Sequence, residues 1–217
     1  MSTASLSISA THTFSKTPVS SLTLLPGIGI KGDCHAGTTV QHRSRMHIVP
    51  PPANLRQVHL IAQETLDELG VGPGEIGENI TTVGVDLLGL GRGAKLHFLR
   101  TAHANGGSTS GEDGNGEGRE GDEGCGNVKR GEGDTKGAVR GELDGDHPIV
   151  VVRGLRNPCP QIDKFRTGLK EGFVERDMEG KVVKRRAGVM GTVERGGVVE
   201  VGMRVVVEGG EGGLEVV

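Results

Sequence analysis

Apolar and polar positions along the chain predict mostly short strands. Alternating or β-branched apolar residues mark strands at 19–25, 56–61, 81–85, 94–99, 149–153, 187–193 and 198–208. Glycines and prolines between these segments indicate turns. Only two segments favour a helix: 62–69, which ends at Gly70, and the stretch that begins at Pro160. The pattern therefore predicts a mainly β, barrel-like single domain with a few short helices.

A tract at about 105–146 interrupts this pattern. It consists almost entirely of Gly, Glu, Asp and other polar residues, with 11 acidic and 5 basic side chains. So few apolar groups cannot bury enough surface to offset the entropy of ordering the backbone, and we expect a disordered insert. Because lengthening a loop adds little closure entropy, such an insert need not divide the domain.

Composition restricts the core and the partners. The 217 residues include no Trp or Tyr and only 4 Phe, so the core is expected to be aliphatic. A net charge of −3 disfavours nucleic acid, and no apolar run approaches the ~18 residues that a membrane span needs. The N-terminus shows neither a secretory nor a mitochondrial signal, so a cytoplasmic location is expected.

The strongest candidate for chemistry is the thiol of Cys159. Pro160 suits the first position of a helix, and apolar residues follow at helical spacing, at Ile162, Phe165 and Leu169. Cys159 would then be the N-cap, where unpaired backbone N–H groups and the nearby Arg156 cation favour thiolate over thiol. The alternative is that Cys159 is a small buried hydrophobe, as most lone cysteines are. Flanking prolines and an arginine are unusual surroundings for a space-filling cysteine.

Two further loops concentrate polar side chains. The glycine-rich loop 27–37 carries Lys31, Asp33, Cys34 and His35, and its glycines fit no phosphate-loop motif. The loop 41–47 adds two imidazoles and two guanidiniums, from His42, Arg43, Arg45 and His47. Because guanidiniums match phosphate or carboxylate oxygens, this loop suits an anionic ligand, with a solvated basic loop as the alternative.

These loops also raise the question of zinc. Cys34, His35, His42 and His47 are potential ligands, but their spacing fits no standard structural-zinc signature. A zinc site formed by these four residues is therefore disfavoured.

Five segments taken together resemble the MOSC domain, first defined at the C-terminus of molybdenum cofactor sulfurases. They are KGDCHAG (31–37), QHR (41–43), RQVHLI (56–61), PGEIGENI (73–80) and RNPC (156–159). The resemblance runs in order from about residue 14 to 208, apart from the insert, and implies a single MOSC domain with a MOSC-type β-barrel. Cys34 departs from the family, which more often has Ala or Arg at that position.

The resemblance implies binding of the molybdenum cofactor (molybdopterin), with Cys159 as a sulfur carrier or a molybdenum ligand. It also implies that the cofactor is bound by Lys31, Asp33, His35, His42, Arg43, Arg56, Glu78, Asn79, Arg156 and Asn157. The pyridoxal phosphate domain of the sulfurases is not visible, so sulfur would have to come from a persulfide-donating protein. Two alternatives stay open: a molybdenum-dependent reductase that detoxifies N-hydroxylated compounds with a redox partner, and a non-catalytic cofactor-binding module.

Overall fold

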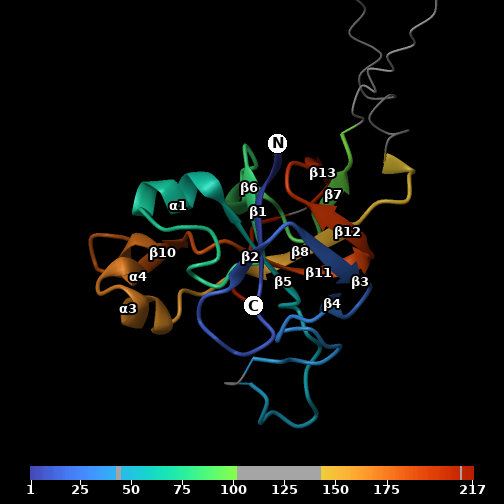
Figure 1. The fold of residues 1–217 in the computed structure, drawn as a ribbon. Helices are drawn as coiled ribbons and strands as arrows, with labels where there is room; N and C mark the ends of the chain where they lie inside the picture. Colours follow the sequence, from blue (N-terminus) through green and yellow to red (C-terminus); the bar gives the residue numbers. More distant parts are fainter. Residues whose placement is uncertain (43–44, 102–142, 211) are drawn as a thin grey trace, which may run out of the picture. The chain divides into compact units, whose positions relative to one another are not determined.

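A closed barrel of seven strands dominates the residues that the structure describes, which are 1–42, 45–101, 143–210 and 212–217 of a computed structural model (Figure 1). Around the barrel the strands follow the order β13 (Arg204–Glu208), β7 (Lys95–Leu99), β8 (Ile149–Leu155), β11 (Val189–Arg195), β5 (Val58–Ala62), β6 (Ile80–Val83) and β1 (Ser2–Ile8). Pairing of Ser2 with Arg204 joins β1 to β13 and completes the circle. The predicted mainly β class with a few short helices is confirmed. The predicted insert at about 105–146 lies almost entirely outside the described residues.

Strand β1 was not expected from the sequence, because its residues Ser2–Ile8 are rich in serine and threonine. Leu6 is fully buried, but Thr3 and Ser7 are buried too. The Thr3 hydroxyl donates a hydrogen bond of 2.7 Å to the Glu200 carbonyl, so its polar atom is satisfied inside the protein. Small hydroxyl side chains thus occupy core-facing positions and hide the alternation that marks a strand. The family resemblance begins at about residue 14, whereas the barrel already needs this first strand.

The only parallel pair among the described strands of the barrel is β5 with β6. A parallel pair needs a crossover connection, and helix α1 (Gln63–Leu69) lies in it. Gly70 ends this helix in the left-handed conformation, with φ of 59°, as the sequence predicted.

Smaller elements surround the barrel. Strand β2 (Thr17–Val19) pairs with β1 outside the closed ring. A three-stranded sheet contains β3 (Ser21–Leu25), β4 (Gly29–Ile30) and β12 (Gly197–Glu200), and a two-stranded sheet contains β9 (Val174–Arg176) and β10 (Val182–Arg185). The remaining described helices are the 3₁₀ turn η1 (Leu87–Gly89), α3 (Gln161–Phe165) and α4 (Leu169–Gly172). No helix in the described part of the chain is long and apolar enough to span a membrane.

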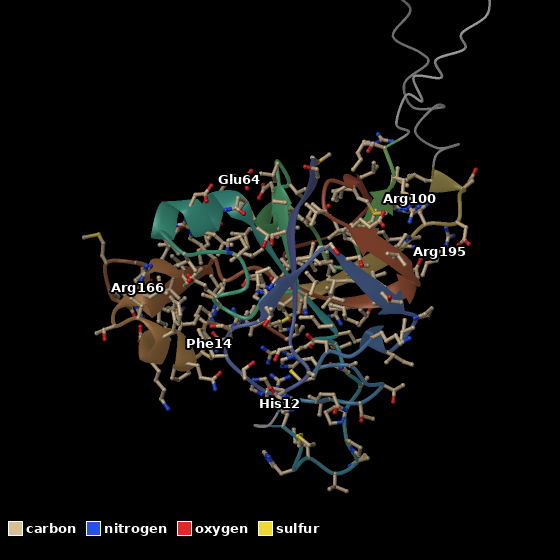
Figure 2. The ribbon with its side chains drawn as sticks, viewed as in Figure 1. His12, Phe14, Glu64, Arg100, Arg166 and Arg195 are labelled. Carbon is tan, nitrogen blue, oxygen red and sulfur yellow. The ribbon has the colours of Figure 1, made fainter. Side chains whose placement is uncertain are left out.

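The core is aliphatic, as the composition predicted. The main cluster fills the barrel with Leu, Ile and Val side chains and one aromatic ring, Phe98. A second cluster, which includes Leu66, Ile162 and Phe173, packs the helices against β5, and Cys159 touches its edge. Figure 2 shows side chains crowded between the strands, with Glu64, Arg100 and Arg166 toward the outside. The barrel therefore supplies a rigid frame, and the second cluster holds the segment that carries the thiol.

Candidate functional site

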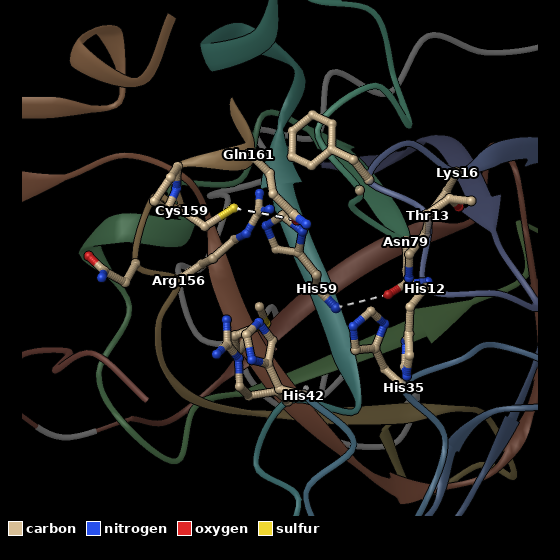
Figure 3. A pocket seen from close by; sticks show the side chains of 16 residues that line it. His12, Thr13, Lys16, His35, His42, His59, Asn79, Arg156, Cys159 and Gln161 are labelled. Carbon is tan, nitrogen blue, oxygen red and sulfur yellow. Dashed lines mark hydrogen bonds between the residues drawn. The ribbon is translucent and has the colours of Figure 1, made fainter. Parts of the chain in front are cut away.

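A cavity of about 270 Å³ opens beside four consecutive barrel strands, β8, β11, β5 and β6 (Figure 3). It is lined by His12, Thr13, Phe14, Lys16, His35, His42, Arg56, His59, Gly77, Asn79, Arg156, Asn157, Cys159, Pro160, Gln161 and Met190. These residues are distant in sequence and meet because Met190 pairs with both His59 and Gly154 across the sheet. The strands thus bring the loops before residue 16, around residue 35 and after residue 155 to one place.

The charge of the lining is one-sided. Three lining residues, Lys16, Arg56 and Arg156, are ordinarily cationic, and none of the described lining residues is Asp or Glu, although Lys16 is paired with Asp33 behind the lining. Burial and the Arg156 charge lower the pKa of Arg56 to about 10, so it is still protonated at neutral pH. Burial and the charges of Arg56, Arg45 and Arg156 lower the pKa of His42 to about 4, so this imidazole is neutral at neutral pH. The cavity therefore attracts an anionic ligand.

Arg156 is held at the centre of this charge. It follows the last residue of β8, and its backbone N–H donates to the Gly188 carbonyl at 3.0 Å. The side chain is buried, and its Nη1 atom has no hydrogen-bond partner among the described residues. Burial lowers the pKa of Arg156, while nearby Cys159 and Glu78 oppose that shift. A buried guanidinium with an unpaired N–H group lowers the stability of the folded protein. An anionic ligand that accepts a hydrogen bond from this group would remove that cost.

His59, on β5, contributes a buried hydrogen-bond acceptor close to the Arg156 donor. Its Nε2 lies 2.7 Å from the Ala187 carbonyl oxygen, so Nε2 carries the proton and donates it. Burial, reinforced by the Arg156 charge, keeps the pKa of His59 well below its ordinary value. In the part of the chain that the structure describes, its buried Nδ1 has no hydrogen-bond partner. In this neutral tautomer Nδ1 is an acceptor, so the wall of the cavity contains both a buried donor and a buried acceptor without a partner among the described residues.

A buried polar network forms another wall of the cavity. Lys16 Nζ lies 2.7 Å from Asp33 Oδ2, and both side chains are almost completely buried. Asn79 Nδ2 also donates to Asp33 Oδ2, at 3.0 Å, and the His35 backbone N–H donates to Asp33 Oδ1 at 3.0 Å. Asp33 itself does not line the cavity but orients residues that do.

The ionisation of Asp33 should make the protein sensitive to acid. Burial opposes ionisation, but hydrogen bonds from His35 and the Lys16 charge outweigh it, so the pKa of Asp33 lies well below its ordinary 3.8. Stability from this carboxylate is fully present above that ordinary value and is lost as the pH falls toward the folded-state pKa. We expect urea unfolding between about pH 4 and about pH 2 to show a steeper loss for the wild type than for Asp33→Asn. Parallel curves would contradict the assigned role of the carboxylate.

Cys159 lies at the edge of the cavity and is half-buried. The sequence predicted it as the N-cap of a helix that includes Ile162, Phe165 and Leu169, and this was wrong. Helix α3 starts at Gln161 with Pro160 as its N-cap, and Gly168, at φ of 80°, separates it from α4. The thiol therefore lies one residue before the cap, and α3 is only 5 residues long. Arg156 and Arg56, rather than a helix terminus, are the nearby positive groups.

The structure separates the predicted site residues into three groups. Those that line the cavity are His35, His42, Arg56, Asn79, Arg156, Asn157 and Cys159. Asp33 and Glu78 are buried outside the lining, where a Glu78 carboxylate oxygen accepts a hydrogen bond from the Gly74 N–H. Lys31 is exposed and does not line the cavity. Arg43 lies outside the described residues.

Sequence reasoning missed several lining residues, above all His12, Lys16 and His59. His59 stands in a motif of the family resemblance, RQVHLI, so its position in a buried strand could have indicated it. Lys16 gave no local signal, because only the fold places it next to Asp33.

The fold has relatives among solved structures. The YuaD protein from Bacillus subtilis matches with a TM-score of 0.60 at 20% sequence identity, over 95% of this chain and 94% of that chain. YiiM from Escherichia coli gives a TM-score of 0.49 at 15% identity, over 100% of this chain and 74% of that chain. No family model and no curated protein matches the sequence. The likeness to YuaD shows a shared fold.

Proposed function

We propose that this chain is a MOSC-type protein that binds the molybdenum cofactor in the cavity, with Cys159 as a carrier of sulfur to it or as a ligand of its molybdenum. The observation that carries the proposal is the buried Arg156, whose Nη1 lacks a partner among the described residues. It stands in a cavity whose described lining includes arginines and no carboxylate, with a thiol at its edge. The sequence segments that resemble the MOSC domain contribute Arg156, Cys159 and several other lining residues.

The residues present fit such a ligand. The molybdenum cofactor carries a phosphate and a dithiolene on a flat pterin, and when bound it supplies the redox chemistry of molybdenum. Arg156 and Arg56 offer charge to its anionic groups, whereas the Lys16 charge is already paired with Asp33. Phe14 and Met190 provide apolar surface for a flat ring. At about 270 Å³ the cavity is slightly smaller than typical ligand sites, so part of the cofactor would extend beyond it.

Cys159 can act either as a ligand of molybdenum or as a carrier of sulfur. A thiolate is a soft ligand suited to a transition metal and is also the group that attacks a persulfide sulfur. As a sulfur carrier the protein needs a persulfide-donating partner, and as a reductase of N-hydroxylated compounds it needs a redox partner. A non-catalytic module needs neither.

The test is purification from a host that makes the molybdenum cofactor, followed by metal analysis and by fluorescence of the oxidised pterin. We expect the wild type and Lys31→Met to retain pterin, because Lys31 is exposed and away from the cavity, and Arg56→Met to lose most of it. Equal retention by Arg56→Met would argue against the cavity as the site.

The variant Cys159→Ser then distinguishes a metal ligand, a sulfur carrier and a binding module. Loss of molybdenum with retained pterin indicates a metal ligand. Retained molybdenum, with loss of a persulfide that mass spectrometry finds on the wild-type chain, indicates a sulfur carrier. If Cys159→Ser matches the wild type in cofactor, persulfide and complementation, the protein is a binding module.

A further inference from the structure

Three side chains at the rim of the cavity form a cluster with metal-ligand chemistry. His12, Cys34 and His35 each offer one ligand atom, and these atoms all lie within 4.8 Å of one another. The rings of His12 and His35 are 5.5 Å apart, and Figure 3 shows them next to each other, across the view from Cys159. All three residues are partly exposed, so an ion can reach them from solvent. We propose that this His12–Cys34–His35 cluster binds a zinc ion.

The donor set is that of a thiophilic first-row cation. One thiolate and two imidazoles suit Zn²⁺, which accepts sulfur and nitrogen ligands in a tetrahedron. Zn–S bonds of about 2.3 Å and Zn–N bonds of about 2.0–2.1 Å place tetrahedral ligands about 3.3–3.6 Å apart. Cys34 Sγ is already 3.3 Å from His35 Nδ1. The widest separation in the cluster exceeds the tetrahedral distance by about 1 Å, which side-chain rotation can close.

Asp33 contacts His35 and so helps to fix the position of the cluster. Its Oδ1 lies 3.2 Å from His35 Nδ1 and 3.0 Å from the His35 backbone nitrogen. Lys16 and Asn79 fix the other oxygen of the same carboxylate. Zinc bound at Nδ1 would replace the contact of this nitrogen with Asp33, while the hydrogen bond from the His35 backbone N–H to Asp33 would still hold the loop in place.

Zinc at this place would connect two loops. His12 belongs to the segment that leads into Lys16, whereas Cys34 and His35 belong to the loop after β4. Three protein ligands leave one tetrahedral position open, and His12 and His35 also line the cavity. The ion would therefore join both loops at the cavity rim and present an exchangeable position there. This set differs from the disfavoured one, because His12 replaces His42 and His47.

The test uses full-length protein freed of metal by a chelator and titrated with Co²⁺, a spectroscopic substitute for zinc. We expect the wild type to show a thiolate-to-cobalt charge-transfer band that Zn²⁺ abolishes by displacement. Cys34→Ser should lose the band, and both Cys34→Ser and His12→Asn should weaken zinc binding by about tenfold or more. Cys159→Ser and Cys125→Ser serve as matched controls and should keep the band, while circular dichroism verifies that each variant is folded.

A wild type without the band, or a band that survives in Cys34→Ser, overturns the proposal. So does a band that disappears in Cys159→Ser, because the thiol ligand would then be the other one. The titration contains no pterin, so its failure would leave the cofactor measurements with Arg56→Met unaffected.

Discussion

Replacing Arg156 with methionine is expected to abolish retention of the molybdenum cofactor and, at the same time, to stabilise the cofactor-free protein. Charge-assisted contacts to a buried guanidinium are strong, so pterin retention should fall by about 100-fold or more. Arg156 is only 8% exposed, and its Nη1 has no partner among the described residues, so in the ligand-free protein Cys159 and Glu78 offset the desolvation cost of its charge only in part. Methionine keeps much of the volume without the charge, and a gain of about 1 kcal/mol or more in the free energy of unfolding is expected. Pterin fluorescence and urea unfolding measure the two effects.

Arg166→Met provides the matched control for this prediction. Arg166 is exposed, and its guanidinium donates to the carbonyls of Leu69 and Gly70 at the end of α1. We expect this control to keep the cofactor and to gain no stability. If Arg156→Met destabilises the cofactor-free protein instead, the guanidinium has a structural role, and its unpartnered Nη1 no longer indicates a ligand.

Replacing Lys16 with methionine should cost about 3–5 kcal/mol of stability in the cofactor-free protein, the usual effect of removing one partner of a buried ion pair. The Lys16 and Asp33 side chains are 2% and 0% exposed. Without the ammonium group, Asp33 must either remain charged in the interior or take up a proton. Urea or thermal unfolding at neutral pH measures the loss.

Two further variants test whether the loss of stability comes from the buried ion pair. Lys95→Met removes an ion pair of similar length, 2.6 Å to Glu194, whose side chains are 37% and 43% exposed, and should cost about 1 kcal/mol or less. The double variant Lys16→Met/Asp33→Asn should recover part of the loss, because it removes the buried charge that lost its partner. Equal costs for Lys16→Met and Lys95→Met would refute the view that burial makes the first pair important.

The sequence predicted local structure well where side chains alternate clearly. The helix over 62–69 with its glycine end appears as Gln63–Leu69 capped by Gly70, and the apolar run from Ile149 forms β8. It failed where a buried strand carries small hydroxyls, as at Thr3 and Ser7 in β1, because such side chains satisfy their polar atoms through tertiary partners.

The sequence by itself determined the aliphatic core, the mainly β class, and the presence of a thiol close to an arginine in the chain. Those features depend on composition and on neighbours within a few residues. Only the tertiary structure decided that Cys159 precedes its helix, that Lys31 faces solvent, and that Lys16 pairs with Asp33. It also decided that His12 meets Cys34 and His35. The physical reason is that burial and charge pairing depend on residues that closure of the barrel brings together from distant parts of the chain, and no local pattern records which of them will meet.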